Sequence, residues 1–450
     1  MRTAYEAGRS LVLSVYYFLV ITAFALVPWK RRPPYERLLD ALRIREDARR
    51  ASSLRFLMLR LFMRTDRETL APGRIPLATL AGWTLRPLLK TLPECWRLAH
   101  GEDEWSGLSR TRRIHLFFRS LPDSLRLANG IGSRFWFDPE RRDAAVFHIP
   151  NRYHIRSCFL LNHLNDPSLP IQQRHFDKAL FYRICRENGW PTIPVYASFE
   201  EGLATTYEPL GDGPLFSKPS RLFEGLGRFE RWDPEPEQGD GVRRYRSGEG
   251  LTVTQAELFN YLETLSKKHP YLLQQLLVPH RAIRELSGVD TLSTLRLPTC
   301  CFPDGRAEVL TVSYFRMPRD PAALMDNRAQ GAVGYGLDTR TGRLTVGALK
   351  GGLGSFSVHP ASGRTVVGFE LPYFEEAAEL AVTAHSQAFA SFPTLGWDIA
   401  ITEDGPVLVE VNIQWGSAHG LPGKAFLGDT AYTDCVLAHM ERHWPQACPT

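Results

Sequence analysis

The stretch WDIAITEDGPVLVEVN, residues 397–412, constrains the fold more than any other part of the chain. Two apolar, β-prone runs flank the turn signal Glu-Asp-Gly, so the sequence predicts a strand, a tight turn and a second strand. A hairpin centred on Asp404 places Asp398 directly opposite Glu410. Side chains alternate along a strand, so Glu410 and Asn412 share one face. The sequence therefore predicts two carboxylates and a carboxamide together on a half-buried hairpin.

These three side chains suggest a cation site. Opposed residues in a hairpin lie roughly 5 Å apart between their Cβ atoms, and like charges that close repel each other, more strongly when they are buried. A cation bound between them removes the repulsion. Asp, Glu and Asn offer only oxygen ligands, which suit Mg²⁺ or Mn²⁺ better than zinc. The alternative is an ordinary hairpin with solvated acids on its outer face, and the hairpin alone does not decide between the two.

The chain is long enough for two or three domains. Its 450 residues are 44% hydrophobic and 23% charged, as in ordinary globular proteins. The net charge of +5 is mild, and no Lys/Arg block with interleaved aromatic residues occurs, so we expect no nucleic-acid partner. The seven cysteines are odd in number and show neither a CxxC motif nor the spacing of a zinc site, which indicates a reducing compartment.

The apolar segment LVLSVYYFLVITAFALV, residues 11–27, contains no charged residue. As a helix it would be about 26 Å long, near the lower limit for crossing a bilayer. Basic residues follow it at 30–32, which favours a cytoplasmic location for the chain beyond. We therefore expect residues 1–32 to anchor the protein at the cytoplasmic face of the inner membrane. A buried or interfacial helix, and an export signal cleaved after Ala-Phe-Ala, remain alternatives.

The predicted secondary structure changes along the chain. Residues 33–139 have apolar positions at roughly helical spacing, which predicts a mainly helical N-terminal region without recognisable chemistry. From about residue 140, short β-like runs alternate with turns. Helices are predicted at 172–188, 254–268 and 373–392. Together these elements give a mixed α+β pattern.

Two lysines upstream of the hairpin are candidates for contacts with phosphate. Lys178 opens a predicted helix, and Lys218 ends an apolar stretch before a loop that contains Gly225 and Gly227. A lysine at the end of a strand offers a compact positive charge, and a glycine loop lets backbone N–H groups approach a phosphate closely. Taken one at a time, each lysine is more simply interpreted as a solvated surface residue.

Taken together, these segments resemble the ATP-grasp superfamily over roughly residues 140–435. The family's order is present: Asp-Lys at a helix start, GWPTIPVY, a strand ending in Lys-Pro before a glycine loop, the hinge strand LLQQLL, and an Asp followed by Glu-x-Asn. Three stretches carry a narrower resemblance to the sugar-transfer-associated ATP-grasp proteins, which are linked to exopolysaccharide biosynthesis. These stretches are GWDIAITEDGPVLVEVN, DTLSTLRLPT and MDNRAQGAVGYGLDTRTGRL.

The resemblance implies an α+β, ATP-grasp fold, in which two α+β subdomains clasp ATP. It divides the chain after the helical region into three parts. Residues 140–212 would form the N-terminal part of the module, 213–280 its first subdomain, and 281–440 its second subdomain with the metal site.

The resemblance also implies roles for individual residues. The residues that would contact the nucleotide are Lys178, Lys218, Gly225, Gly227, Gln275 and Leu277. Of these, Gln275 and Leu277 would contact the adenine through their backbone. The residues that would hold one or two Mg²⁺ (or Mn²⁺) ions are Asp398, Glu410 and Asn412. The residues that would line the γ-phosphate and acyl-phosphate site are Arg296, Arg316 and Asn327. The chain departs from the family in its hinge, where Gln274-Gln275 stands in place of the Glu of many relatives.

The implied activity is that of an ATP-dependent ligase, which activates a carboxylate as an acyl phosphate and joins it to an amine or hydroxyl. The acceptor would be a sugar- or amine-bearing molecule of surface polysaccharide or glycan-precursor biosynthesis, and glycosyltransferases or polysaccharide-assembly proteins would be partners. Two alternatives remain open: an ATP-grasp phosphotransferase, and a non-catalytic nucleotide-binding partner of a glycosyltransferase complex. The sequence identifies neither the acid nor the acceptor.

Overall fold

The computed structural model describes residues 151–169, 176–221, 227–349, 355–415 and 426–443, together with Leu421 and a few isolated positions between 49 and 111. The predicted anchor at 11–27 lies outside the described residues, as does the helical region predicted at 33–139 apart from those isolated positions. No helix within the described ranges combines the length and the apolar character that a membrane crossing needs.

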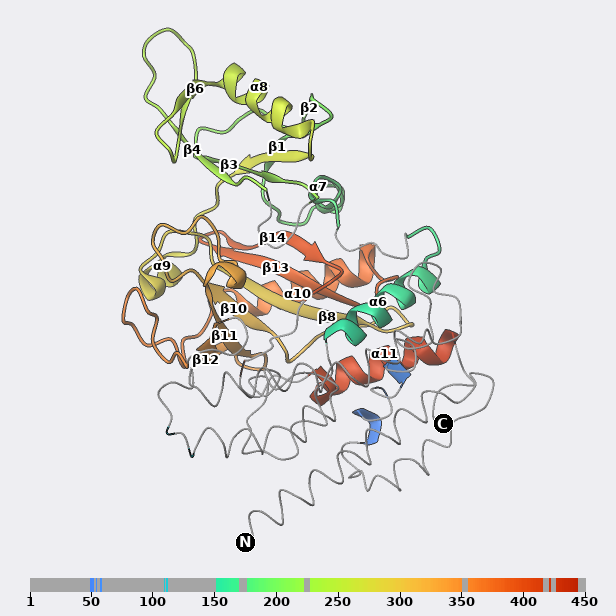
Figure 1. The fold of residues 1–450 in the computed structure, drawn as a ribbon. Helices are drawn as coiled ribbons and strands as arrows, with labels where there is room; N and C mark the ends of the chain where they lie inside the picture. Colours follow the sequence, from blue (N-terminus) through green and yellow to red (C-terminus); the bar gives the residue numbers. More distant parts are fainter. Residues whose placement is uncertain are drawn as a thin grey trace.

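The first of two seven-stranded sheets lies at the top of Figure 1 and has the order β2-β1-β7-β3-β4-β5-β6. Its strands are β1 (Val195–Glu200), β2 (Leu203–Thr206), β3 (Leu215–Pro219), β4 (Glu230–Pro234), β5 (Arg244–Ser247), β6 (Thr252–Thr254) and β7 (Tyr271–Gln275). All neighbouring strands in it are antiparallel. The helices packed against it are α7 (Lys178–Glu187) and α8 (Gln255–Ser266).

The second sheet has the order β12-β11-β10-β8-β13-β14, with β9 paired to β8. Its strands are β8 (Thr294–Cys301), β9 (Ala307–Val309), β10 (Tyr314–Met317), β11 (Val333–Asp338), β12 (Arg343–Ala348), β13 (Thr394–Thr402) and β14 (Gly405–Asn412). From residue 151 on, the other helices of the described ranges are α6 (Asn151–Asn165), α9 (Arg281–Ser287), α10 (Phe374–Ala388), α11 (Thr430–His443) and the short 3₁₀ turns η4 (Arg328–Gln330) and η5 (Phe426–Gly428). The predicted mixed α/β composition is therefore confirmed, with both sheets antiparallel.

Each face of the second sheet is covered by a different helix. Thr299 of β8 hydrogen-bonds with His385 of α10 at 2.7 Å. The next residue, Cys300, donates to the backbone oxygen of Ala431 in α11. Since neighbouring side chains in a strand point to opposite faces, α10 and α11 lie on opposite sides of the sheet.

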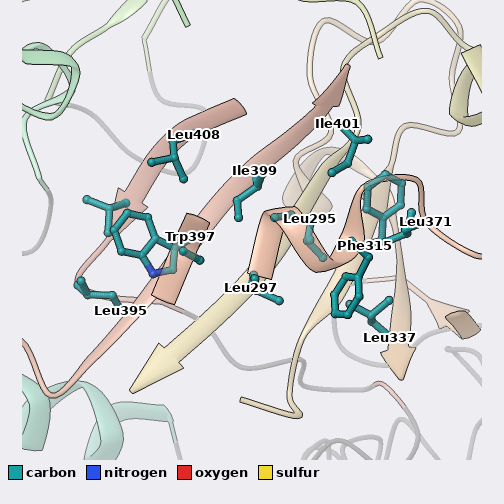
Figure 2. Packing of buried hydrophobic residues seen from close by; sticks show 14 of the residues in the cluster. Leu295, Leu297, Phe315, Leu337, Leu371, Leu395, Trp397, Ile399, Ile401 and Leu408 are labelled. Atoms are coloured by element: carbon teal, nitrogen blue, oxygen red, sulfur yellow. The ribbon is translucent and has the colours of Figure 1, made fainter. Parts of the chain in front are cut away.

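The face toward α10 forms the largest described core (Figure 2). Every second residue of β13 belongs to it, including Trp397 and Ile399, and β8 contributes Leu295 and Leu297 in the same way. The Trp397 ring is fully buried against Phe389, and its Nε1 donates to a threonine of β8 at 2.8 Å. The alternation sends the residues between them, Asp398 among them, to the other face.

A β-bulge in β14 decides which face Glu410 occupies. Leu408 pairs with Ile399 and Glu410 pairs with Asp398, so the residue between them, Val409, is extra. Leu408 and Val411 both lie in the core although their spacing is odd, because the bulge changes the phase of the alternation. Glu410 is therefore displaced from the core face.

The predicted pairing of Asp398 with Glu410 is confirmed, but the predicted centre of the hairpin is wrong. Thr402 pairs with Gly405, so the turn consists of Glu403 and Asp404 rather than being centred on Asp404. The turn lies half a residue earlier than predicted, which by itself would shift the pairing by one residue. The bulge adds one residue to β14 only, so Asp398 still pairs with Glu410.

The three predicted helices are present with shifted ends. The segment predicted at 172–188 begins as helix α7 at Lys178, because the Asp177 side chain accepts the backbone N–H groups of the first turn. Thr254 caps α8 through a capping box with Glu257. The helices α6, α9 and α11 were not predicted. The strands β1 and β2, which lie in the predicted part 140–212, join the first sheet.

We predict that Trp397→Ala lowers the free energy of unfolding by about 3–5 kcal/mol, because it leaves a large cavity in the core beneath the strand that carries Asp398. Urea denaturation followed by circular dichroism measures this loss. Leu251→Ala, at a position whose exposed fraction is 61%, is the control and should change stability by less than about 0.5 kcal/mol. Equal, small changes in both variants would contradict the assignment of Trp397 to the core.

Candidate functional site

The face of the second sheet away from α10 brings five predicted site residues together. In the strand register, Asp398 of β13 lies opposite Arg296 of β8 on one side and opposite Glu410 of β14 on the other. Arg316, on the next strand β10, reaches the same carboxylate. The amide of Asn412 also lies within hydrogen-bonding distance of Asp398 and Glu410. The antiparallel register therefore places these groups side by side across four neighbouring strands.

Asp398 is held by two guanidinium groups. Arg296 donates to it through both Nε and Nη2, the latter at 3.0 Å from Oδ2. Arg316 Nη2 lies 2.9 Å from the same oxygen, and only 3% of the Asp398 side chain is exposed. Burial alone would raise the pKa of Asp398, but the two arginines lower it well below its ordinary range. The carboxylate is therefore ionised, and the pairing compensates its burial.

A second buried acid, Asp326, completes this network and was not predicted. Arg316 Nε lies 3.3 Å from its Oδ2, and Thr294 donates its hydroxyl to the same oxygen. Arg316 is thereby fixed between two carboxylates, and its pKa is raised above the ordinary value in spite of its burial. The adjacent Asn327 was predicted to line the site. Its backbone oxygen accepts the N–H of Gln330, the last residue of η4, and its catalytic role stays a prediction.

The predicted metal ligands converge. Asn412 Nδ2 lies 3.3 Å from Glu410 Oε1 and 3.5 Å from Asp398 Oδ2. Within the described ranges no cluster of three His, Cys, Asp or Glu side chains suits a metal, so a site here needs the carboxamide. Two carboxylates and a carboxamide form an oxygen-only donor set when Asn412 presents Oδ1 in place of the Nδ2 that faces the acids here, and such a set fits Mg²⁺ or Mn²⁺. The repulsion expected between the two acids is compensated in this structure by cationic side chains of the protein itself.

Two lysines approach the hairpin from the side of the first sheet. Lys178 Nζ, at the start of α7, lies 3.7 Å from Glu410 Oε2 and donates to the backbone oxygen of Ser220. Lys218 on β3 is buried, and this burial lowers its pKa to about 8 against the opposing effect of the Glu410 charge. A buried lysine whose charge is only partly compensated is suited to bind an anion. The two lysines predicted to contact phosphate thus both lie near Glu410, and their binding of phosphate stays a prediction.

Backbone contacts connect the same two parts of the chain. The N–H of Leu408 donates to the oxygen of Pro191 at 2.9 Å, and the Thr192 hydroxyl donates to the Leu408 oxygen at 3.0 Å. These bonds join the segment before β1 to β14, close to the bulge. They fix the hairpin relative to the segment that leads into the first sheet.

The structure says less about the other residues predicted to contact the nucleotide. Gly225 lies outside the described residues. Gly227 is exposed and has a φ of +91°, a backbone conformation that glycine adopts readily. The N–H of Gln275 donates to Pro194 at 2.9 Å, so it is occupied within the fold. Leu277 follows the end of β7. Contact of Gln275 and Leu277 with adenine stays a prediction.

The charges at the site favour an anionic ligand. The carboxylates at the site are Asp326, Asp398 and Glu410, and the facing cations are Lys178, Lys218, Arg296 and Arg316. The excess of positive charge is what a polyphosphate would neutralise.

Part of the chain matches a known protein family. Residues 239–429 match the family described as sugar-transfer associated ATP-grasp, which confirms the resemblance seen in the sequence. The matched segment includes the network around Asp398 and the whole β13–β14 hairpin. Lys178 and Lys218 lie before it. No curated protein matches the chain.

Three ATP-grasp ligases are among the solved structures that match the chain, all with low TM-scores. The L-amino acid ligase from Bacillus licheniformis is 12% identical, with a TM-score of 0.28, over 54% of this chain and 42% of that chain. The D-alanine–D-alanine ligase from Bacillus anthracis is 12% identical, with a TM-score of 0.28, over 60% and 68% of the two chains. The ATP-grasp ligase PsnB, complexed with a minimal precursor, Mg and ADP, is 14% identical, with a TM-score of 0.28, over 59% of each chain. The chain thus spans less than two thirds of the first and third of these proteins.

We predict that Lys218→Met weakens nucleotide binding by roughly 10- to 100-fold. A hydrogen bond to a charged group contributes about 1.5–3 kcal/mol, and methionine keeps most of the stem while removing the charge. Titration with a fluorescent ATP analogue measures the affinity. Lys267→Met, at an exposed position after α8, is the control and should bind like the wild type. Wild-type affinity in Lys218→Met would exclude this lysine from the nucleotide site.

Proposed function

We propose that the protein is an ATP- and Mg²⁺-dependent ligase that joins a carboxylate to an amine or hydroxyl acceptor, because residues 239–429 match the family model of the sugar-transfer-associated ATP-grasp proteins. One observation carries the proposal: lysines from the side of the first sheet and the Asp398–Glu410–Asn412 group of the second meet at one place. This arrangement can hold a polyphosphate from two sides. The matched family supports ATP as that polyphosphate.

The residues of the chain have distinct tasks in this proposal. Lys178 and Lys218 bind the phosphate oxygens nearest the first sheet, and ammonium groups suit this as compact charges. Arg296 and Arg316 lie further along the face and neutralise charge at the terminal phosphate. Their carboxylate partners keep both guanidinium groups in fixed positions, so little reorganisation is needed when the substrate binds.

The residues that would hold the metal are those that converge on the hairpin, namely Asp398, Glu410 and Asn412. Bound there, Mg²⁺ would neutralise charge on the phosphates and polarise the phosphorus for attack. Phosphoryl transfer needs positioning and charge neutralisation more than a protein nucleophile. The site has this character, since its described polar groups are cations, hydrogen-bond donors and metal-binding oxygens.

The reaction we propose has two steps. The substrate carboxylate attacks the terminal phosphorus of ATP, which forms an acyl phosphate and releases ADP. An amine or hydroxyl then attacks the acyl carbon, which releases inorganic phosphate and a proton and forms an amide or ester. Each turnover therefore releases one ADP and one phosphate. A phosphotransferase would instead keep the phosphate on its product.

We place the activity in surface-polysaccharide or glycan-precursor biosynthesis, with a sugar- or amine-bearing acceptor and glycosyltransferase or polysaccharide-assembly partners. The support is the sugar-transfer association of the matched family. We also place the protein at the cytoplasmic face of the inner membrane, on the basis of the uncharged segment 11–27. Fractionation of the full-length protein against a form lacking residues 1–32 tests this location, and the proposal fails if both forms remain in the soluble fraction.

We predict that purified protein, supplied with Mg²⁺–ATP, pooled amino and sugar acids and candidate sugar-nucleotide acceptors, forms ADP and phosphate in equal amounts together with an amide or ester. Mass spectrometry of the products and enzymatic assays of ADP and phosphate measure this. ADP with a stable phosphorylated product and no free phosphate would show a phosphotransferase instead.

Two variants serve as controls for this assay. Glu410→Gln should abolish turnover by removing a metal-binding charge while leaving the fold intact. Glu403→Gln lies on the turn of the same hairpin, with a side chain that is 56% exposed, and should turn over nearly normally. Nucleotide binding without any turnover in the wild type, across the whole substrate pool, would favour a non-catalytic partner of a glycosyltransferase complex.

A further inference from the structure

Arg328 is a half-buried cation for which the described part of the chain provides no carboxylate. Its Nη2 donates to the backbone oxygens of Leu349, at 2.7 Å, and Ala348, at 3.4 Å. Its buried Nε has no hydrogen-bond partner among the described residues. Arg296 and Arg316, in contrast, are both paired with acids. Arg328 is therefore the arginine of this face whose charge is left uncompensated.

The guanidinium of Arg328 lies over the polar face of the sheet, beside Arg316. Gly334 of β11 is the cross-strand partner of Arg316. A Cβ atom at Gly334 would lie 2.9 Å from Arg328 Nε and 3.1 Å from its Cδ, so the glycine makes room for this side chain. The Tyr314 ring lies on the other side, with its centroid 5.4 Å from the guanidinium carbon.

This surrounding is unfavourable for a positive charge. Burial lowers the pKa of Arg328 from its ordinary value, and the positive charges of Arg316 and Arg296 lower it further, against the opposing effect of Tyr314. A buried charge without a partner destabilises a fold. The backbone oxygens of Leu349 and Ala348 need only a hydrogen-bond donor, which a neutral side chain can also provide, so they do not account for the positive charge. A bound anion would supply the compensation that the described residues lack.

The position of Arg328 separates it from the lysines of the predicted phosphate site. Along the sheet, β11 is four strands from β14, or about 19 Å at the usual strand spacing. The lysines approach Glu410 on β14, so a triphosphate that begins there and runs toward Asp398 ends before β11. Next to Arg328, Tyr314 packs with Ala348 and Leu421 in a small apolar cluster. One charge therefore lies beside apolar side chains, a combination that small-molecule sites use.

We propose that Arg328, beside Arg316 and over Gly334, is the binding site for the carboxylate of the acid substrate. This inference rests on the proposed function, because the acid is the second anion that the reaction requires. Its carboxylate must lie next to the terminal phosphate, and Arg328 is one strand beyond Arg316, which reaches Asp398. A guanidinium binds a carboxylate through paired N–H groups.

The test uses acetate and inorganic phosphate as probes, because the acid itself is unidentified. Each probe is titrated by ligand-observed NMR into full-length protein saturated with Mg²⁺–ADP. Acetate should bind the wild type, and Arg328→Met should weaken its binding at least roughly tenfold while leaving the affinity for Mg²⁺–ADP within about twofold. Arg319→Met is the matched control, because Arg319 is an exposed arginine in the segment between β10 and η4. It should bind acetate like the wild type.

A second variant keeps the charge in place. Gly334→Ala retains Arg328 but crowds its guanidinium, and it should also weaken acetate binding. Melting temperatures without ligand distinguish a structural role: Arg328→Met should melt no lower than the wild type, because it removes an uncompensated buried charge. A lower melting temperature together with unchanged acetate affinity would overturn the inference and make Arg328 a structural clamp of β12.

The remaining outcomes are also decisive. The inference is overturned if the wild type binds Mg²⁺–ADP but not acetate, or if Arg328→Met loses affinity for phosphate and not for acetate. It is overturned as well if Arg328→Met loses Mg²⁺–ADP affinity as strongly as acetate affinity, since Arg328 would then belong to the nucleotide site. Failure of the wild type to bind Mg²⁺–ADP would overturn the proposed function itself.

Discussion

The ion pairs of Asp398 with Arg296 and Arg316 are the interaction on which the rest of the site depends. They join three neighbouring strands, β13, β8 and β10, on a face that is buried from solvent at this point. Removal of one partner from a buried ion pair leaves an uncompensated charge and costs about 3–5 kcal/mol. The cluster therefore fixes two arginines and one acid at the centre of the sheet. A polyphosphate that reaches this face meets charges whose positions are already set.

The register of the second sheet provides the frame for this cluster. Trp397 and its alternating neighbours bury one face, and this sends Asp398 to the other. The bulge at Val409 then brings Glu410 opposite Asp398 while Leu408 and Val411 both stay in the core. The arrangement of acids and the packing of the core are thus two results of one strand pairing.

Much of this could be predicted from the sequence, because it depends on local order. Alternation and the Glu-Asp-Gly turn predicted the hairpin and the pairing of Asp398 with Glu410, although the bulge was missed, since it follows from packing of Leu408 and Val411 against other elements. Asp326 and Arg328 were missed as site residues for a related reason: they follow β10 in a loop, and only the folded sheet brings that loop over Arg316 and Gly334. The sequence signal at that place, the Asn327 of a family motif, indicated the loop but not which neighbours take part. The helix predicted at 172–188 begins too early, whereas the Asp-Lys motif placed a helix start at Lys178, where α7 does begin.

The central claim is that the hairpin binds a divalent metal together with the phosphates of a nucleotide. The most direct measurement is a crystal structure with Mn²⁺ and a non-hydrolysable ATP analogue, in which anomalous scattering locates the metal. We predict a Mn²⁺ peak coordinated by Glu410 and by Asn412 or Asp398, with Lys178 and Lys218 in contact with phosphate oxygens. A metal bound elsewhere, or a nucleotide bound while Lys178 still pairs with Glu410 and no metal lies at the hairpin, would contradict this account.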